Sequence, residues 1–282
     1  MNLFSKIIVF AFKVFPKEFI SRALGKLAKK KLPKIILIPW ISSYCVLFGV
    51  NMSESKKDAY DFQTFDEFFT RELKSGIRKI DVSKNSVISP VDGKMMEFGA
   101  IEKNMLIQAK GKIYMLESLL EDGALASKFE NGSFLTIYLA PKNYHRIHAP
   151  ISGKIAGYQY IPGSLFCVNK ISSETIENLF SKNERLITYL ECRKNTIAIV
   201  KVGACVVGKI CATYENAAFD TSCNMALKKT YSKKIPIEKG EEIGRFEIGS
   251  TVVLLFESGV ITFGDLVRGA EIKMGQKIGT LA

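Results

Sequence analysis

Both histidines of this 282-residue chain lie in one short segment, residues 139–150, at positions 145 and 148. Histidine is the side chain best suited to proton transfer near neutral pH. A strand would place positions 145 and 148 on opposite faces, and the flanking prolines indicate a turn or a bulge in this segment. A lone histidine is more often structural than functional. Two in one segment, and none elsewhere in the chain, favour a chemical role.

Two further segments carry groups that could act together with these histidines. Asp92 lies in a Pro-Val-Asp-Gly sequence, where an aspartate most often only makes a turn. Ser250 lies in a Gly-Ser-Thr sequence, which is also common in turns. Together with a histidine, however, they supply the hydroxyl, imidazole and carboxylate of an activated serine. The G-x-S-x-G elbow typical of many hydrolases is absent from this segment.

The elements that would position these groups are mainly strands. Short apolar runs separated by Gly, Pro and Asn predict a mainly β catalytic domain, a barrel or a sandwich, with small helical insertions. The runs are residues 134–139, 196–202, 204–210 and 251–256, and the candidate helical insertions are residues 115–120 and 174–180.

The N-terminal part of the chain is predicted to be helical. Thr64 and Glu67 have the spacing of a capping box, which predicts a short helix that joins this part to the β domain. We therefore expect two regions: a helical, basic, amphipathic membrane-association region at 1–74 and a β-rich catalytic domain at 75–282.

The positive charge is concentrated at the N-terminus. Residues 1–34 hold nine of the 40 Lys and Arg residues and one acidic residue, Glu18, in a chain of net charge +12. At helical spacing, residues 18–31 have an apolar face and a basic face, which suits the headgroup layer of an anionic membrane. Large apolar side chains within this arm argue against nucleic acid as its partner. An ordinary helix pair packed on the domain remains an alternative.

Two other membrane-related readings are less favoured. A cleaved signal peptide is disfavoured because Lys13 and Lys17 interrupt the apolar run and no small-residue cleavage site follows it. The apolar run at 35–52 has about the length of a membrane span, but Pro39, Gly49 and two serines interrupt it.

The six cysteines are predicted to be free thiols in a reducing compartment. They form no C-x-x-C pair, and their spacing is not that of a disulfide framework. With only two histidines in the chain and no clustered cysteines, no metal site is expected.

Eight segments of the chain form a characteristic set when taken in order. They are FDEFFTREL (65–73), SPVDG (89–93), QAKGKIY (108–114), PKNYHRIHAP (141–150), PGSLFCVN (162–169), NER (183–185), GST (249–251) and MGQKIG (274–279). Together they resemble the phosphatidylserine decarboxylase family over roughly residues 35–282. Two departures are visible: Ile248 stands where the family usually has Leu, and Met115 stands where a small hydroxyl residue is common.

The resemblance implies a proenzyme that cleaves itself by serinolysis between Gly249 and Ser250, with Asp92 and His148 as the charge-relay partners of Ser250. The β chain (1–249) and the α chain (250–282) would stay associated as a heterodimer. Ser250 would become a covalent pyruvoyl group, which forms a Schiff base with phosphatidylserine and decarboxylates it to phosphatidylethanolamine. With His148 assigned to cleavage, His145 is the candidate proton donor in decarboxylation.

The implied location is the cytoplasmic side of the cell membrane, as a peripheral or monotopic protein. Two rival functions remain. A serine hydrolase or transacylase would use the same residues without losing the peptide bond, and a non-catalytic membrane-binding module would use none of them. A lipoyl-type carrier is disfavoured because no lysine stands at a clear hairpin tip.

Overall fold

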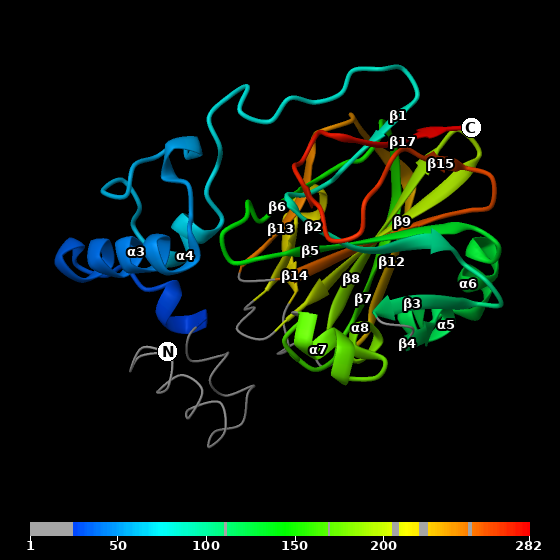
Figure 1. The fold of residues 1–282 in the computed structure, drawn as a ribbon, viewed down its shortest axis with the longest axis horizontal. Helices are drawn as coiled ribbons and strands as arrows, with labels where there is room; N and C mark the ends of the chain where they lie inside the picture. Colours follow the sequence, from blue (N-terminus) through cyan, green and yellow to red (C-terminus); the bar gives the residue numbers. More distant parts are fainter. Residues whose placement is uncertain (1–24, 110–111, 169, 205–208, 220–224, 248–249) are drawn as a thin grey trace.

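The computed structural model describes residues 25–109, 112–168, 170–204, 209–219, 225–247 and 250–282. Strands account for far more of the described chain than helices do, which confirms the mainly β prediction. Figure 1 shows helices α3 and α4 to one side of the sheets, with the segment that follows α4 crossing over to β1.

The largest sheet has eight strands, and every neighbouring pair in it is antiparallel. Strand β14 lies near its middle and pairs with β9 on one side and β5 on the other. In spatial order the strands are β12 (Leu227–Ile237), β7 (Gly153–Ile161), β8 (Arg185–Cys192), β9 (Asn195–Gly203), β14 (Ser250–Phe256), β5 (Ser133–Leu139), β2 (Gly93–Ala100) and β16 (Glu271–Ile272).

Three smaller sheets complete the β structure. The four-stranded sheet consists of β11 (Ala217–Phe219), β10 (Ile210–Ala212), β13 (Glu242–Phe246) and β6 (Arg146–His148). The three-stranded sheet consists of β1 (Ser86–Ile88), β17 (Lys277–Leu281) and β15 (Ile261–Phe263), and the hairpin consists of β3 (Met105–Ala109) and β4 (Lys112–Met115).

Both faces of the large sheet are buried along β14, which explains why its sequence is an unbroken apolar run. Val252 and Leu254 belong to the core shared with the four-stranded sheet. Val253 and Leu255 belong to a second core, under the small helices α5 (Leu116–Leu120), α6 (Gly123–Phe129) and α8 (Leu179–Lys182). A strand buried on both faces reads as continuously apolar rather than alternating.

The N-terminal part has its own small core and packs against the histidine segment. Helix α3 (Lys34–Phe48), the 3₁₀ helix η1 (Met52–Glu54) and α4 (Phe65–Phe69) enclose it with aromatic side chains. The hydroxyl of Tyr44 donates to the carbonyl of Pro141 (3.4 Å), and Arg146 Nε donates to the carbonyl of Thr70 (2.9 Å). Within the described residues, no helix is long and apolar enough to span a membrane.

Several predicted elements are confirmed. The runs at 134–139, 196–202 and 251–256 form β5, β9 and β14, and residues 116–120 form α5. Thr64 caps α4 by accepting a hydrogen bond from the backbone N–H of Glu67 (3.0 Å). The carboxylate of Glu67 reaches back to the N–H of Gln63 (2.7 Å) rather than to that of Thr64, so only half of the capping box forms as expected.

Other predictions need correction or lie outside the described residues. Ala204 and Lys209 are outside strands, residues 205–208 are not described, and the strand there begins at Ile210. The insertion expected at 174–180 is two short helices, α7 (Lys170–Thr175) and α8, because Asn178 adopts a left-handed conformation between them. Half of the helix expected at 18–31, residues 18–24, lies outside the described residues, and residues 25–28 are helical. Among the described cysteines, Cys45, Cys192 and Cys211 are free thiols.

Candidate active site

His148 ends β6 and is held on both sides of its ring. Its backbone N–H donates to the carbonyl of Pro90 (2.9 Å), which places it beside the Asp92 segment. Ring atom Nδ1 lies 2.7 Å from the carbonyl of Gly240, and Nε2 lies 3.0 Å from the hydroxyl of Tyr144. Because a carbonyl only accepts, Nδ1 carries the proton and Nε2 presents its lone pair to Tyr144. Burial lowers the pKa of His148, although the bond to Gly240 opposes this shift.

His145 precedes β6 and is completely buried. Its Nδ1 donates to the carbonyl of Asn143 (2.8 Å), and its ring packs on Phe69 of α4 at 4.1 Å between centroids. Among the described residues, Nε2 has no hydrogen-bond partner. Burial lowers the pKa of His145 to about 3, so the ring is neutral at physiological pH and Nε2 is an unprotonated acceptor.

Opposite His148 in β13, the pairing register shifts between Glu242 and Gly244. The extra residue of this bulge lies in β13 and not in the histidine segment. The turn predicted in the histidine segment lies before β6, where the N–H of Asn143 donates to the carbonyl of Ala140 (2.9 Å). The two rings have different surroundings, His145 against Phe69 and His148 against Tyr144.

The Asp92 carboxylate is buried and fully engaged. Arg78 Nε donates to Oδ1 (2.9 Å) and Oδ2 (3.2 Å), and Arg78 Nη2 donates to Oδ2 (2.5 Å). The backbone N–H of Met274 donates to Oδ1 (2.9 Å). The Asp92 carboxylate is therefore held by two separate segments: Arg78 precedes it in the chain, and Met274 lies near the C-terminus.

Ser250 is the first residue of β14 and is completely buried. It pairs with Gly203 of β9 and Leu139 of β5. Within the described part of the chain its hydroxyl has no hydrogen-bond partner. Gly249, the other half of the predicted cleavage site, and Ile248 lie outside the described residues.

The fold brings the histidine segment and the serine segment side by side. The N–H of Phe246 donates to the carbonyl of His145 (3.0 Å), and Ser250 pairs with Leu139, so the two segments are in contact at both of these points. The direct hydrogen bond expected between Asp92 and His148 is not among the contacts of the described residues. The His148 tautomer is set by Gly240 instead; burial lowers the His148 pKa, and the negative charge of Asp92 is one of the smaller contributions that oppose this lowering.

Comparison with known proteins identifies the family of the chain. The family model described as phosphatidylserine decarboxylase matches residues 65–280. The proenzyme from Anaeromyxobacter sp. (strain K) is 41% identical over 280 residues, covering 98% of this chain and 99% of the relative. The chain belongs to the phosphatidylserine decarboxylase family. It is therefore an enzyme of a lyase family whose members are decarboxylases.

Two other members of the family show similar coverage. The phosphatidylserine decarboxylase proenzyme from Myxococcus xanthus (strain DK1622) is 39% identical and covers 95% of this chain and 96% of itself. The one from Alcanivorax borkumensis is also 39% identical, with 99% of this chain and 97% of the relative covered. The likeness thus extends beyond the catalytic segments to the N-terminal helical region.

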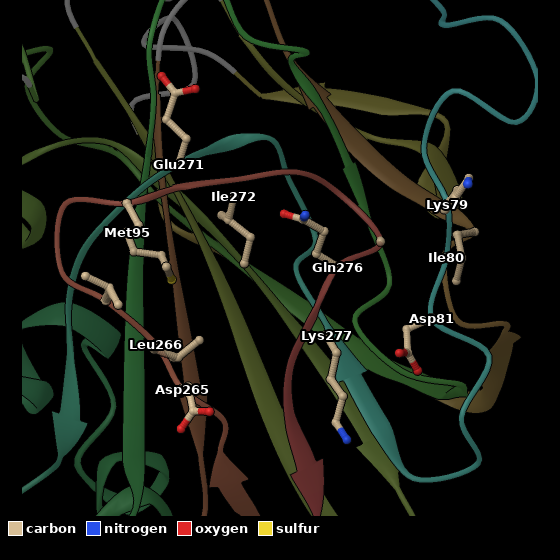
Figure 2. Close-up of a pocket in the computed structure, with 13 residues that line it drawn as sticks. Lys79, Ile80, Asp81, Met95, Asp265, Leu266, Glu271, Ile272, Gln276 and Lys277 are labelled. Atoms are coloured by element: carbon tan, nitrogen blue, oxygen red, sulfur yellow. The ribbon is translucent and has the colours of Figure 1, made fainter.

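The smaller of two hollows is lined by residues that contact Asp92 and His148. A cavity of about 350 Å³ is lined by Arg78, Tyr144 and Met274, which hold Asp92 and His148, and also by Arg146 and Glu242. A larger hollow of about 600 Å³, shown in Figure 2, is bordered by Met95, Asp265, Gln276 and Lys277 among others. None of Asp92, His145, His148 or Ser250 lines either hollow, but only the smaller one is lined by residues that hold Asp92 and His148, so we place the candidate chemistry beside it.

Sequence reasoning missed three residues that contact the candidate groups: Arg78, Tyr144 and Phe69. Tyr144 could have been suspected from its place in the histidine segment. Phe69 lies in the F-F-T-R-E-L motif, but nothing in that motif indicates which side chain it covers. Arg78 belongs to no recognisable motif. Its contact with Asp92 depends on how two separate segments fold together.

Proposed function

We propose that this chain is a phosphatidylserine decarboxylase that matures by cleaving itself between Gly249 and Ser250. The observation that carries the proposal is the position of Ser250. Its hydroxyl is buried at the first residue of a central strand, and it has no hydrogen-bond partner among the described residues. A buried hydroxyl without a partner is costly, which favours a chemical role over a structural one.

In the proposed cleavage, Ser250 Oγ attacks the carbonyl carbon of Gly249, and the peptide bond becomes an ester with release of the Ser250 amine. His148 Nε2 takes the hydroxyl proton as general base, and the negative charge of Asp92 favours the imidazolium that results. Elimination across Cα–Cβ of residue 250 then frees Gly249 as a carboxylate. The remaining dehydroalanine takes up water and loses ammonia, which leaves a pyruvoyl group on the α chain.

The surroundings of Ser250 suit such a group. It would be held covalently at position 250, between Gly203 and Leu139, in a site that excludes water. When formed, the group supplies an electron-withdrawing carbonyl that accepts the amine of phosphatidylserine and weakens the bond to its carboxylate. His145, with an unprotonated Nε2, can deliver a proton only after it has accepted one. We assign it to proton transfer in decarboxylation to phosphatidylethanolamine.

We also propose that the N-terminal region, residues 1–74, holds the catalytic domain, residues 75–282, against the cytoplasmic face of the cell membrane. Helix α3 turns one uncharged face outward: Ile35 and Val46 are 83% and 87% exposed, and Ile36 and Leu47 are 53% and 56% exposed. Exposed lysines at 26, 30 and 31 lie just before this helix in the chain. An apolar face next to basic side chains suits an anionic lipid surface.

Intact mass under denaturing conditions tests the central proposal. The wild type, incubated in detergent at neutral pH, is expected to give two fragments that part after residue 249, the C-terminal one blocked by a pyruvoyl group. Ser250→Ala is expected to stay whole. A single full-length mass for the wild type would reject self-cleavage, and turnover of an ester substrate by that intact chain would indicate a serine hydrolase.

The role of His145 has its own test. His145→Ala is expected to cleave normally and to lose decarboxylation of phosphatidylserine in detergent micelles. A His145→Ala enzyme that cleaves and decarboxylates at full rate would remove His145 from the mechanism.

A further inference from the structure

Arg78 lies between Asp92 and the N-terminal helical region. One edge of its guanidinium, Nε with Nη2, grips both oxygens of the Asp92 carboxylate. Nη2 also donates to Glu54 Oε2 at 2.6 Å. Only 6% of each of the Arg78 and Asp92 side chains is exposed. A planar, two-pronged contact of this kind fixes orientation as well as charge.

The contacts close into a ring. The second oxygen of Glu54 faces Lys273 Nζ at 3.4 Å, and the residue after Lys273, Met274, donates its backbone N–H to Asp92. The ring therefore joins η1, the turn before β2 and the segment after β16. Burial acts to lower the pKa of Arg78, but its bonds to Asp92 and Glu54 outweigh burial and raise it, so the guanidinium stays charged.

This ring of contacts fixes the Asp92 carboxylate, which His148 does not do. Both ring nitrogens of His148 are occupied by Gly240 and Tyr144, so the imidazole itself does not fix the Asp92 carboxylate. If Arg78 were removed, a buried carboxylate would keep one backbone donor and would turn away or take up a proton. In either case its negative charge would no longer stand at the same place beside His148.

We propose that Arg78 is a positioning residue for self-cleavage, and that Glu54 makes this positioning depend on the docking of the N-terminal helical region. The inference rests on the proposed function, because it assigns a role in the cleavage at Gly249-Ser250. Arg78 does not touch the reacting atoms. It holds Asp92, and Glu54 of η1 holds Arg78.

Chemical rescue tests the role directly. Arg78→Ala leaves a space next to the cavity of about 350 Å³ that Arg78 lines, so a free guanidinium ion can enter it. The proenzyme is made by cell-free synthesis, and the fraction cleaved is followed on denaturing gels. We expect Arg78→Ala to cleave roughly 10²-fold more slowly, the scale of loss when a catalytic group is misplaced. Millimolar guanidinium, far below denaturing concentrations, is expected to restore much of the rate.

Sodium chloride at the same ionic strength is the salt control, and Arg268→Ala is the matched variant. Arg268 pairs with Glu97 on the surface, so its loss should leave cleavage unchanged with or without guanidinium. Cleavage of Arg78→Ala at the wild-type rate would overturn the inference. Slow cleavage of Arg78→Ala that guanidinium does not speed up would also overturn the inference, because it would mean that Arg78 has a purely structural role.

Glu54→Gln keeps Arg78 and tests the second half of the inference. Cleavage several-fold slower than wild type is expected in this variant, and an unchanged rate would remove the coupling to η1. This variant also keeps the inference testable if Arg78→Ala does not fold. A wild-type chain that never cleaves would reject the proposed function itself, which is a different outcome from any of these.

Discussion

His145 and His148 present their rings to the protein in the same way. Each donates from Nδ1 to a backbone carbonyl, and each leaves Nε2 as the basic atom. They differ in what Nε2 meets: the hydroxyl of Tyr144 for His148, and no partner among the described residues for His145. Both rings are neutral at physiological pH because burial lowers both pKa values. Two identical side chains thus present a basic nitrogen to different surroundings.

The lowered pKa of His148 predicts the pH dependence of self-cleavage. A general base works in its unprotonated form, and a pKa below 6.5 keeps His148 unprotonated at and above neutrality. The cleavage rate should therefore be flat between about pH 7 and 8.5 and should fall only below about pH 6.5. Time courses of cleavage at half-unit pH steps measure this, with His148→Gln as the inactive control. A rate still rising above pH 7.5 would contradict the assignment.

The burial of Lys201 predicts an effect on the stability of the fold rather than on self-cleavage. It is completely buried on β9, its Nζ donates to the Thr188 hydroxyl (2.6 Å), and it lies 5.3 Å from the Tyr214 ring centre. Burial lowers its pKa to about 7. The unfolded chain therefore binds this proton more tightly than the folded chain, so the lysine costs stability at pH 7. The cost shrinks as pH rises toward the unfolded pKa of about 10.4.

In an uncleaved Ser250→Ala background, Lys201→Met should raise the free energy of unfolding by roughly 1–4 kcal/mol at pH 7. The increase in the free energy of unfolding should be smaller at pH 9.5. Urea denaturation at both pH values measures this, and Lys154→Met, an exposed lysine on β7, is the control. Destabilisation of Lys201→Met at pH 7 would show that the Thr188 contact outweighs the cost of burial.

At the scale of elements, strands were easier to predict than their neighbours. The runs that became β5, β9 and β14 are recognisable because both faces of the sheet are buried there. Their order in the sheet was not predictable, since register comes from contacts between segments far apart in sequence. The same limit hid the contact of Arg78 with Asp92. Residue types and motifs indicated Asp92, His148 and Ser250, but only the fold shows what each side chain touches.

The Met115 departure has an explanation at this scale. Met115 is the N-cap residue of α5, its backbone is extended, and its side chain makes no cap hydrogen bond. A small hydroxyl residue at this position could accept one from the first turn of the helix.

Met115→Ser should therefore raise the free energy of unfolding by about 1 kcal/mol. Met115→Ala, which removes the methionine without adding a hydroxyl, separates capping from loss of the side chain. Thermal unfolding of the two variants in the uncleaved background measures the difference. Equal stability of the Ser and Ala variants would reject the capping explanation.

Helix α3 carries the prediction about membranes. Val46 and Leu47 point outward on its uncharged face. Replacing both with Glu should weaken flotation of the protein with anionic vesicles, because charges are costly in the acyl layer. Self-cleavage should not change, because both side chains are exposed and do not take part in the packing of α3 on the histidine segment. Val82→Glu with Val267→Glu, which places the same charges on two other exposed valines, is the matched control. Equal flotation of the two double variants would exclude α3 from the membrane contact.

For the molecule as a whole, the concentration of positive charge at the N-terminus could be predicted from the sequence. The packing of the N-terminal region on the histidine segment could not. Residues of its last turn lie directly on the histidine segment: Phe69 covers His145, and the carbonyl of Thr70 accepts from Arg146. The region that we assign to the membrane therefore also forms a wall of the candidate active site. This arrangement would place the reacting groups close to a lipid headgroup.

The whole-molecule prediction is that the α chain stays bound after cleavage. Residues 250–282 contain four strands, and three of them pair with strands of the β chain: β14 with β5 and β9, β16 with β2, and β17 with β1. Along β14 alone, seven residues pair on each side. Breaking one peptide bond at the start of β14 leaves all of these hydrogen bonds and both buried faces in place.

Size-exclusion chromatography of the cleaved protein, with mass detection under denaturing conditions, should therefore give both chains in one peak. The two chains should separate only in the urea range where the β domain unfolds. Leu254→Ala, which leaves a cavity in the core on β14, should lower that urea midpoint by an amount that corresponds to about 2–5 kcal/mol. An α chain that elutes alone in native buffer would mean that the strand pairing does not survive cleavage.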